Sequence, residues 1–231
     1  MADKQHSRPD WRPLDSRAPS SLKRILLHYR FRLLLGSIIL VMALLAFPSP
    51  PLPLELGSLV LMVLAALNTL RSRSPLFYFI CLAGVFSLCM QFIPQDWHLR
   101  PLLHQGIPQM SFYLLLVVAL FRRVTQERPV TGELLYGLCS LYLNFVLVFA
   151  FAYNLIEQLW PHSFNGATPL HLDSFIYFSM ITLTTIGYGD ISPVLPLARL
   201  LAGAEAIMGA LFIALAVARG LSLMNDRQDE L

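Results

Sequence analysis

The chain has 231 residues, of which 56% are hydrophobic and only 13% charged, and its formal net charge is +3. This composition is too apolar for a soluble globular domain, and several apolar runs approach the ~20 residues that span a bilayer core. We therefore expect an all-α integral membrane protein. Residues 1–20 are polar and basic without an apolar core, so we expect no cleaved signal peptide.

The apolar runs predict six transmembrane helices. Because proline cannot continue the hydrogen-bond ladder of a helix, Pro48 ends the first span, and Pro75 opens the third. Pro94 and a polar stretch follow the third span. The expected spans cover residues 25–47, 54–70, 75–93, 107–121, 133–155 and 195–219.

The distribution of basic residues sets the orientation of these spans. Fifteen of the 17 Lys and Arg residues fall on one side of the membrane, whereas the other side receives only Arg100 and Arg199. The positive-inside rule makes the richer side cytoplasmic, and an even number of spans returns both termini to it. We expect a multi-pass protein of the cell membrane, plasma or inner, with both termini in the cytoplasm.

The segment between the fifth and sixth spans predicts a loop that enters the membrane and returns. Residues 157–169 form an expected outer turret with aromatic side chains and a turn. Residues 172–184 predict a helix of about three turns, capped by Asp173 or Ser174 and too short to cross. A non-helical return is stable in a membrane only where protein surrounds it or water faces it, which argues for an oligomer.

The short helix leads directly into a distinctive heptapeptide. Its residues are Thr184, Thr185, Ile186, Gly187, Tyr188, Gly189 and Asp190. This motif resembles the selectivity filter of the tetrameric potassium channels. The resemblance implies that potassium ions exchange their water for main-chain oxygens, supplied by Thr185, Ile186, Gly187 and Tyr188.

The chemistry of such a filter explains its residue types. Carbonyls that all point at one axis require a backbone of alternating handedness, and only glycine adopts positive φ at little cost. We expect positive φ at Gly187 and Gly189. The Thr185 hydroxyl adds an oxygen at the inner end. Ile186 and Tyr188 are expected to turn outward and pack against the supporting helix. The filter ends at the acid that follows Gly189.

Residues 131–221 resemble the two-helix pore module of the same family. By this resemblance, Tyr177 and Phe178 are aromatic residues that surround the filter near its tyrosine, and Thr182 matches a residue of the pore helix. Gly209 occupies the position of a hinge glycine in the inner helix. Ile181 departs from the pattern, because some bacterial members carry there a glutamate paired with the filter aspartate.

Glu205 is the one acid inside the sixth span, and it supports two interpretations. An intramembrane carboxylate is costly and marks a functional candidate by default. The first interpretation is a structural bond to the back of the pore helix, for which its backbone and Thr182 are candidate partners. The second is a pH-sensitive or ion-attracting group near the cavity.

Ile213 and Val217 lie one turn apart below Gly209. We expect them to line the inner pore as a hydrophobic gate that closes by dewetting. Packing within the helix bundle is the alternative explanation of both residues.

Four helices before a pore are also the layout of voltage-gated channels, but the fourth span lacks a voltage sensor. A sensor needs arginine at every third residue, since each charge crossing the field contributes only ~2.3 kcal/mol per 100 mV. The fourth span contains none. We therefore expect gating to depend only weakly on voltage.

The chain is expected to divide into four regions. These are a basic cytoplasmic tail at 1–24, a four-helix domain without a voltage sensor at 25–128, a pore domain at 129–224 and a short cytoplasmic tail at 225–231. We expect no ligand-binding gating domain after the pore.

These observations predict a homotetrameric, potassium-selective channel that passes the ion down its gradient. Its expected partners are potassium ions, the lipid bilayer and copies of itself, without nucleic acid. The sequence contains no metal-binding helix, phosphate loop or paired nucleophile and base, so we expect neither an enzyme nor a cofactor. Two alternatives are a potassium-uptake transporter subunit and a membrane sensor whose first four helices bind a ligand while the pore is regulatory.

Overall fold

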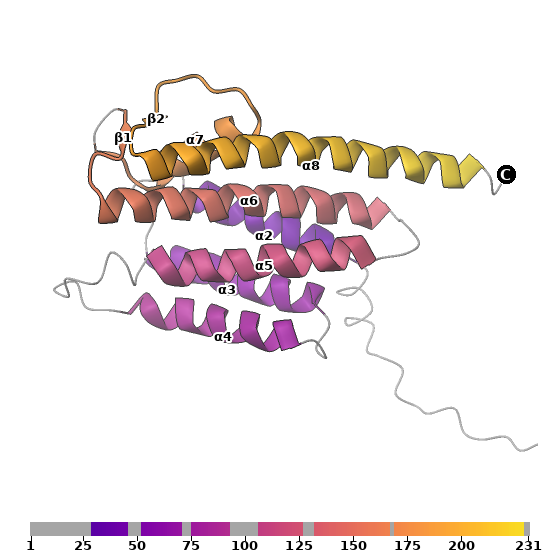
Figure 1. Cartoon of the computed structure of the whole chain (residues 1–231). Helices are drawn as coiled ribbons and strands as arrows, with labels where there is room; N and C mark the ends of the chain where they lie inside the picture. The colour runs from indigo at the N-terminus through magenta and orange to yellow at the C-terminus, as the bar shows by residue number, and fades with distance from the viewer. Residues whose placement is uncertain are drawn as a thin grey trace, which may run out of the picture.

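The computed structural model describes residues 29–45, 52–70, 75–92, 106–126, 132–166 and 169–228. Helices dominate this part of the chain (Figure 1). The elements are α2 (Arg30–Leu45), α3 (Leu52–Thr69), α4 (Pro75–Met90), α5 (Ile107–Gln126), α6 (Gly132–Leu159), β1 (Phe164–Asn165), α7 (Leu172–Leu183), β2 (Ser192–Pro193) and α8 (Pro196–Gln228). Each expected span coincides with one helix, although residues 25–28, 46–47 and 93 lie outside the described residues.

Among the described residues, three helices are long and apolar enough to cross a membrane, by length and composition alone. Their apolar stretches are Ile107–Thr125 in α5, Glu133–Leu159 in α6 and Pro196–Arg219 in α8. α3, α4 and α7 carry shorter apolar stretches, which are Leu56–Thr69, Leu76–Met90 and Leu172–Leu183. These helices support a multi-pass membrane protein, while the number of six spans, the re-entrant loop and the domain boundaries stay predictions.

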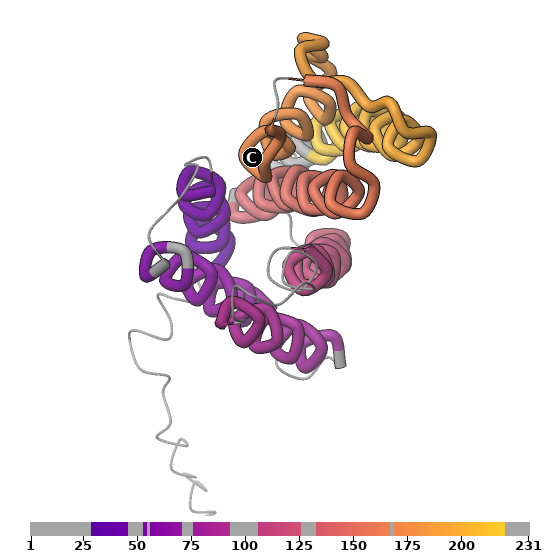
Figure 2. The backbone as a smooth tube through the Cα atoms, turned by 90° about the vertical axis from the view of Figure 1, so that its left-hand side faces the viewer, coloured from indigo at the N-terminus to yellow at the C-terminus, as the bar shows by residue number. Residues whose placement is uncertain are grey.

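α6 is the central helix of the molecule. It packs against α2 and α5 on one side and against α7 and α8 on the other. Residues 146–154 of α6 are buried all round, as expected for a helix that is apolar on every face. In Figure 2, α6 to α8 lie together and α2 to α5 lie to one side of them, so α6 joins the two groups.

Polar contacts fix the relative direction of the helices. Nε of Arg32 lies 2.6 Å from Oε1 of Glu133, so α2 and α6 begin at the same end of the molecule. Thr69, at the end of α3, donates to the carbonyl oxygen of Arg30 at 3.3 Å. Phe212 in the second half of α8 packs on Leu134 near the start of α6. The helices therefore alternate in direction, and the first described residues and the end of α8 share one end (Figure 1).

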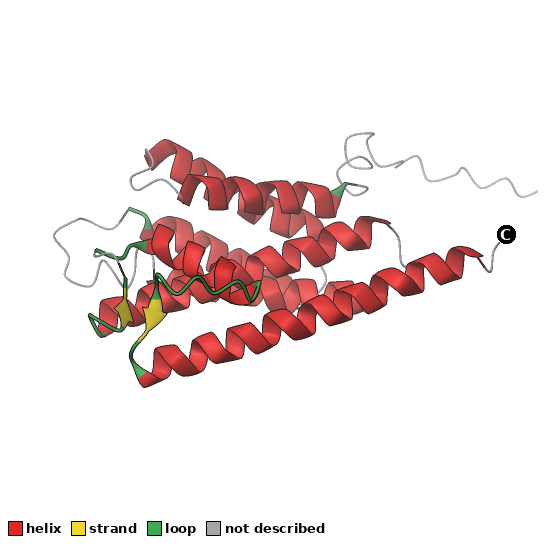
Figure 3. Ribbon diagram, turned by 90° about the horizontal axis from the view of Figure 1, so that it is seen from above, coloured by secondary structure: helices red, strands yellow, loops and turns green. Residues whose placement is uncertain are grey.

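A two-stranded sheet closes the opposite end. β1 and β2 pair antiparallel, with Phe164 opposite Pro193 and Asn165 opposite Ser192. The backbone N–H groups of Val194 and the next residue both donate to the carbonyl oxygen of Ser163, at 2.8 and 3.2 Å. The turret and the segment that leaves the 184–191 loop are thereby tied together. Figure 3 shows this loop as an extended chain between α7 and β2.

The start of α7 differs from the expectation. His171 is the residue before the helix, and no side chain makes a capping hydrogen bond there. The prediction that Asp173 or Ser174 caps the helix is therefore wrong. Asp173 lies inside the first turn, where a negative charge still interacts favourably with the helix dipole.

Candidate functional site: the loop after α7

The backbone of the loop after α7 alternates its handedness. The angle φ is positive at every second residue: 60° at Thr185, 56° at Gly187 and 83° at Gly189. The prediction for the two glycines is confirmed. Thr185 adopts the same conformation although positive φ is unusual for a β-branched residue. This alternation is the conformation that a row of carbonyls facing one axis requires.

The N–H groups of the loop are bonded on the side of α7. Those of Ile186 and Gly187 both donate to the carbonyl oxygen of Ile181, at 2.8 and 3.1 Å, and that of Thr185 donates to Thr182 at 3.0 Å. In the part of the chain that the structure describes, no backbone donor bonds to the carbonyls of residues 185–188. The N–H groups of residues 185–187 are thus occupied by α7, and the carbonyl groups of residues 185–188 remain available as hydrogen-bond or cation acceptors.

α7 adds an electrostatic preference to this row. The helix ends at Leu183, and its C-terminal end carries partial negative charge. Residues 184–190 are all exposed in the single chain. A row of unpaired carbonyls facing lipid is unstable, so this face requires other protein or water. A partly dehydrated cation is the ligand that such oxygens favour.

Tyr177 and Phe178, which are adjacent in α7, lie on different sides of the helix. Tyr177 is 36% exposed, and its hydroxyl group interacts with Asp190. Phe178 is buried, with its ring centroid 5.1 Å from Tyr153 and 5.7 Å from Phe164. The prediction that Phe178 surrounds the filter tyrosine is therefore wrong, because its ring faces α6 and the turret.

Gly209 lies directly against the end of α7. A Cβ atom built on Gly209 would lie 2.1 Å from the carbonyl oxygen of Leu183 and 2.9 Å from its carbonyl carbon. The same oxygen accepts a hydrogen bond from the Tyr142 hydroxyl at 3.1 Å. α8 is helical through this position. Close approach of two backbones therefore requires glycine here, and the proposed hinge role stays a prediction.

Glu205 joins three helices. Its side chain is 0% exposed. The Tyr153 hydroxyl on α6 donates to Oε2 at 2.5 Å, and the Ser179 hydroxyl on α7 makes a short contact with Oε1. The expected bond to α7 is present, although its partner is the Ser179 side chain rather than the backbone or Thr182. The carboxyl group does lie between the inner helix and α7, which is the kind of support that the first interpretation expected.

α8 presents a large apolar surface outside the fold. Only 11% of its apolar stretch is buried, compared with 67% in α6. Ile213 and Val217, the expected gate residues, are exposed in the single chain at 46% and 57%. The same helix exposes Leu200, Ile207, Leu211 and Leu215. Lipid or further copies of the chain must cover this surface.

A carboxylate shapes the turret. Oε1 of Glu157 accepts the backbone N–H of His162, and Oε2 accepts that of Ser163, both at 2.9 Å. His162 has a φ of 68°, an unusual conformation that these bonds hold in place. Ser163 in turn holds the segment after the 184–191 loop through its carbonyl oxygen.

We expect Glu157→Gln to loosen the turret. Glutamine keeps one acceptor oxygen and places an N–H₂ group against the other backbone donor, so one charge-assisted bond of about 1.5–3 kcal/mol is lost. Amide hydrogen exchange at His162 and Ser163 should accelerate by about tenfold or more, at 1.4 kcal/mol per factor of ten. Asp173→Asn is the matched control and should leave both rates unchanged; equal rates in the Glu157 variant would contradict the assignment.

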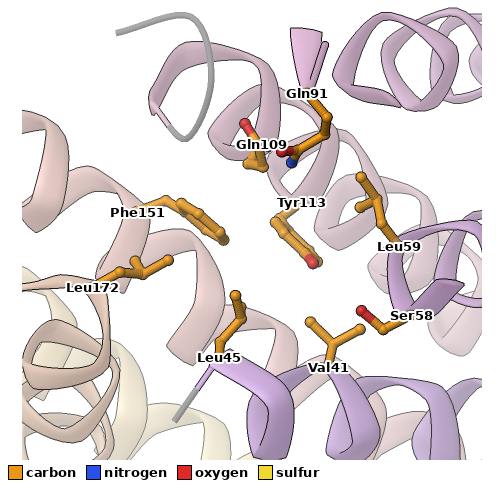
Figure 4. Close-up of a pocket in the computed structure, with 9 residues that line it drawn as sticks. All are labelled: Val41, Leu45, Ser58, Leu59, Gln91, Gln109, Tyr113, Phe151 and Leu172. Atoms are coloured by element: carbon orange, nitrogen blue, oxygen red, sulfur yellow. The ribbon is translucent and has the colours of Figure 1, made fainter. Parts of the chain in front are cut away.

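A small cavity lies where the first helices meet the pore region (Figure 4). Its volume is about 20 Å³, which suits a water-sized guest. Gln91 and Gln109 line it, and within the described residues the Oε1 atom of each is buried without a hydrogen-bond partner. Tyr113, Phe151 and Leu172 complete its inner side. The cavity is far smaller than the ~300 Å³ of a typical small-molecule site.

The sequence reasoning missed Tyr142, Tyr153 and Ser179. A signal was present, because a buried tyrosine hydroxyl inside a membrane helix needs a partner. The two tyrosines are 11 residues apart, about three turns, so they lie on one face of α6. That face therefore had to meet polar groups of another helix.

Two comparisons with known proteins concern the pore region. Residues 141–225 match a family model described as "Ion channel". Over 97 residues the chain is 38% identical to the inward rectifier potassium channel Kirbac3.1 of Paramagnetospirillum magnetotacticum. This similarity covers 40% of the chain and 29% of the relative's length. The matched residues are thus similar to ion channels, and the relative of known name is a potassium channel.

Proposed function

We propose that this protein is a potassium-selective channel in which four copies enclose one pore. Residues 185–188 of each copy supply the oxygens that replace the water of the ion, and Asp190 ends the filter at the outer mouth. The pore conducts potassium down its electrochemical gradient in a cell membrane. The end of the molecule where α2 begins and α8 ends then faces the cytoplasm.

The observation that carries this proposal is the combination of alternating φ and unpaired carbonyls at residues 185–188. The backbone N–H groups of residues 185–187 donate to α7, whereas no backbone donor in the described residues bonds to the carbonyls of residues 185–188. Main-chain oxygens in rows are the ligands that potassium filters use. The similarity of residues 141–225 to ion channels supports the same interpretation of this loop.

The exposed surfaces support a tetramer. Tyr188 is 71% exposed and Leu200 73% exposed, so the filter loop and α8 both lack cover in the single chain. One loop supplies one side of a pore, and closed rotational symmetry supplies the other sides with the same surface. Fourfold symmetry gives each ion oxygens from four strands.

Two other functions fit the chain less well. Transporter subunits of the potassium-uptake kind usually join four degenerate loops in one polypeptide, whereas this chain has one loop with the full motif. A sensor needs a ligand site in the first four helices. The cavity between those helices and α6 has room for about one water, which does not favour a lipid or a drug-sized solute there.

The proposal is tested by ion flux from purified protein in liposomes. We expect potassium efflux that rubidium supports and sodium does not. The flux should depend only weakly on voltage, because the helix before the pore domain carries no row of arginines. Equal sodium and potassium flux would contradict a potassium filter. Absence of flux across voltage, pH and membrane tension would favour the sensor.

A further inference from the structure

We propose that Glu205 is a neutral carboxylic acid and that its proton completes a hydrogen-bonded clamp between α6, α7 and α8. The clamp is defined here as the side chains of Tyr153, Ser179 and Glu205 with the carbonyl oxygen of Val146. In the sequence, Ser179 lies 26 residues and Tyr153 lies 52 residues from Glu205. The proposed protonation state of Glu205 does not depend on the proposed channel function. The effect of this protonation state on potassium flux does rest on that function.

The clamp has more oxygen–oxygen contacts than its two hydroxyl groups have hydrogen atoms. Three oxygen–oxygen contacts hold the clamp: Tyr153 to Oε2 of Glu205 at 2.5 Å, Ser179 to Oε1, and Ser179 to the Val146 carbonyl at 3.0 Å. Each contact needs one hydrogen to be a hydrogen bond, yet the two hydroxyl groups supply only two. The third hydrogen must come from the carboxyl group. Glu205 then donates to Ser179, which donates onward to Val146.

The surroundings of Glu205 favour the neutral form. The side chain is fully buried, and in the described part of the chain no basic group lies within 4.0 Å of it. On α6 the titratable groups of this face are Tyr142 and Tyr153, and Tyr142 donates instead to Leu183. α7 carries Asp173 and Tyr177, and α8 carries Arg199, which is exposed. A buried charge without a partner is disfavoured relative to the neutral acid.

The clamp acts on the filter through α7. Ser179 lies one helical turn before Leu183, whose carbonyl oxygen contacts Gly209 and Tyr142. If Glu205 loses its proton, the single hydrogen of Ser179 turns to the carboxylate and the bond to Val146 is lost. α7 is then released from α6 just before the filter. Glu205 is therefore a positioning residue, and its ionisation at alkaline pH weakens the support of the filter.

Infrared difference spectroscopy of the purified full chain tests the proton directly. We expect the carbonyl stretch of a protonated carboxylic acid at neutral pH, absent from Glu205→Gln and shifted in Tyr153→Phe, which removes one hydrogen bond to the acid. A spectrum of the unaltered protein without this band at neutral pH would overturn the proposal. This result is independent of whether the protein conducts potassium.

Flux measurements test the positioning role. Glutamine can donate to Ser179 and accept from Tyr153, so Glu205→Gln should keep potassium flux within about twofold and lose the decline of flux at alkaline pH. Glu205→Ala and Ser179→Ala should each reduce flux more strongly, by about tenfold. A folded Glu205→Gln variant that loses as much flux as Glu205→Ala would overturn the role. If the unaltered protein shows no flux, the proposed function fails while the infrared band still decides the proton.

Discussion

Replacement of Gly209 by alanine should abolish potassium flux and disrupt assembly. The new Cβ atom would lie 2.1 Å from the carbonyl oxygen of Leu183, whereas real Cβ contacts essentially never fall below 3.0 Å. The obstacle is backbone, so it cannot rotate away as a side chain would. Overpacking of this kind costs about 1–3 kcal/mol per site, and four copies would bear it in one assembly. Thermal unfolding of the purified oligomer and flux in liposomes measure the two effects.

Gly36→Ala is the control for this substitution. Gly36 also lies within a helix, but no atom comes within 4 Å of the position that its Cβ would occupy, so alanine should leave flux unchanged and stabilise α2 by up to about 1 kcal/mol. A hinge role for Gly209 predicts a different outcome. The alanine variant would then assemble normally and change only the opening of the pore. Normal assembly would therefore contradict the close-approach account.

Replacement of Gly187 by alanine should remove the preference for potassium over sodium. Space is not the obstacle, since nothing in the single chain lies within 4 Å of the added atom. The cost comes from φ of 56°, which disfavours a residue with Cβ by about 1–2 kcal/mol in each copy, or about 4–8 kcal/mol in four copies. Rotation of the peptide relieves this strain and turns a carbonyl away from the row. We expect the permeability ratio to fall at least about tenfold, equivalent to 1.4 kcal/mol.

The control for the filter substitution is Gly57→Ala, which adds the same atom to α3 without any neighbour within 4 Å. This variant should keep the permeability ratio of the unaltered protein. The measurement is the reversal potential in mixed potassium and sodium solutions. An unchanged ratio in a folded and assembled Gly187 variant would show that selectivity does not depend on this backbone.

The helices and the loop backbone were predictable because they depend on local sequence. Apolar runs and prolines located these helices, although α5 ends at Gln126 rather than at 121 and α8 at Gln228 rather than at 219. The two glycines of the loop adopt positive φ as their lack of Cβ allows. Thr185 joins them against its own preference, because its N–H bonds to Thr182 and its neighbours bond to the end of α7.

The contacts between helices were less predictable because rotation and spacing decide them. Phe178 and Tyr177 are adjacent in sequence, yet one enters the core and the other faces the filter. Glu205 was recognised as costly, but its partner could not be chosen without knowing which face of α7 meets α8. The role of Gly209 could not be predicted for the same reason. A glycine in a helix indicates either flexibility or close approach of another backbone, and only the distance to Leu183 favours close approach.

The most direct test of the central claim is a cryo-electron microscopy structure of the purified protein in potassium solution. The account predicts four copies around one axis, with the carbonyls of residues 185–188 facing that axis and ion density between their layers. Sodium in place of potassium should change or remove this density. A structure in which these residues lie away from any shared axis, or in which the copies enclose no pore, would contradict the account.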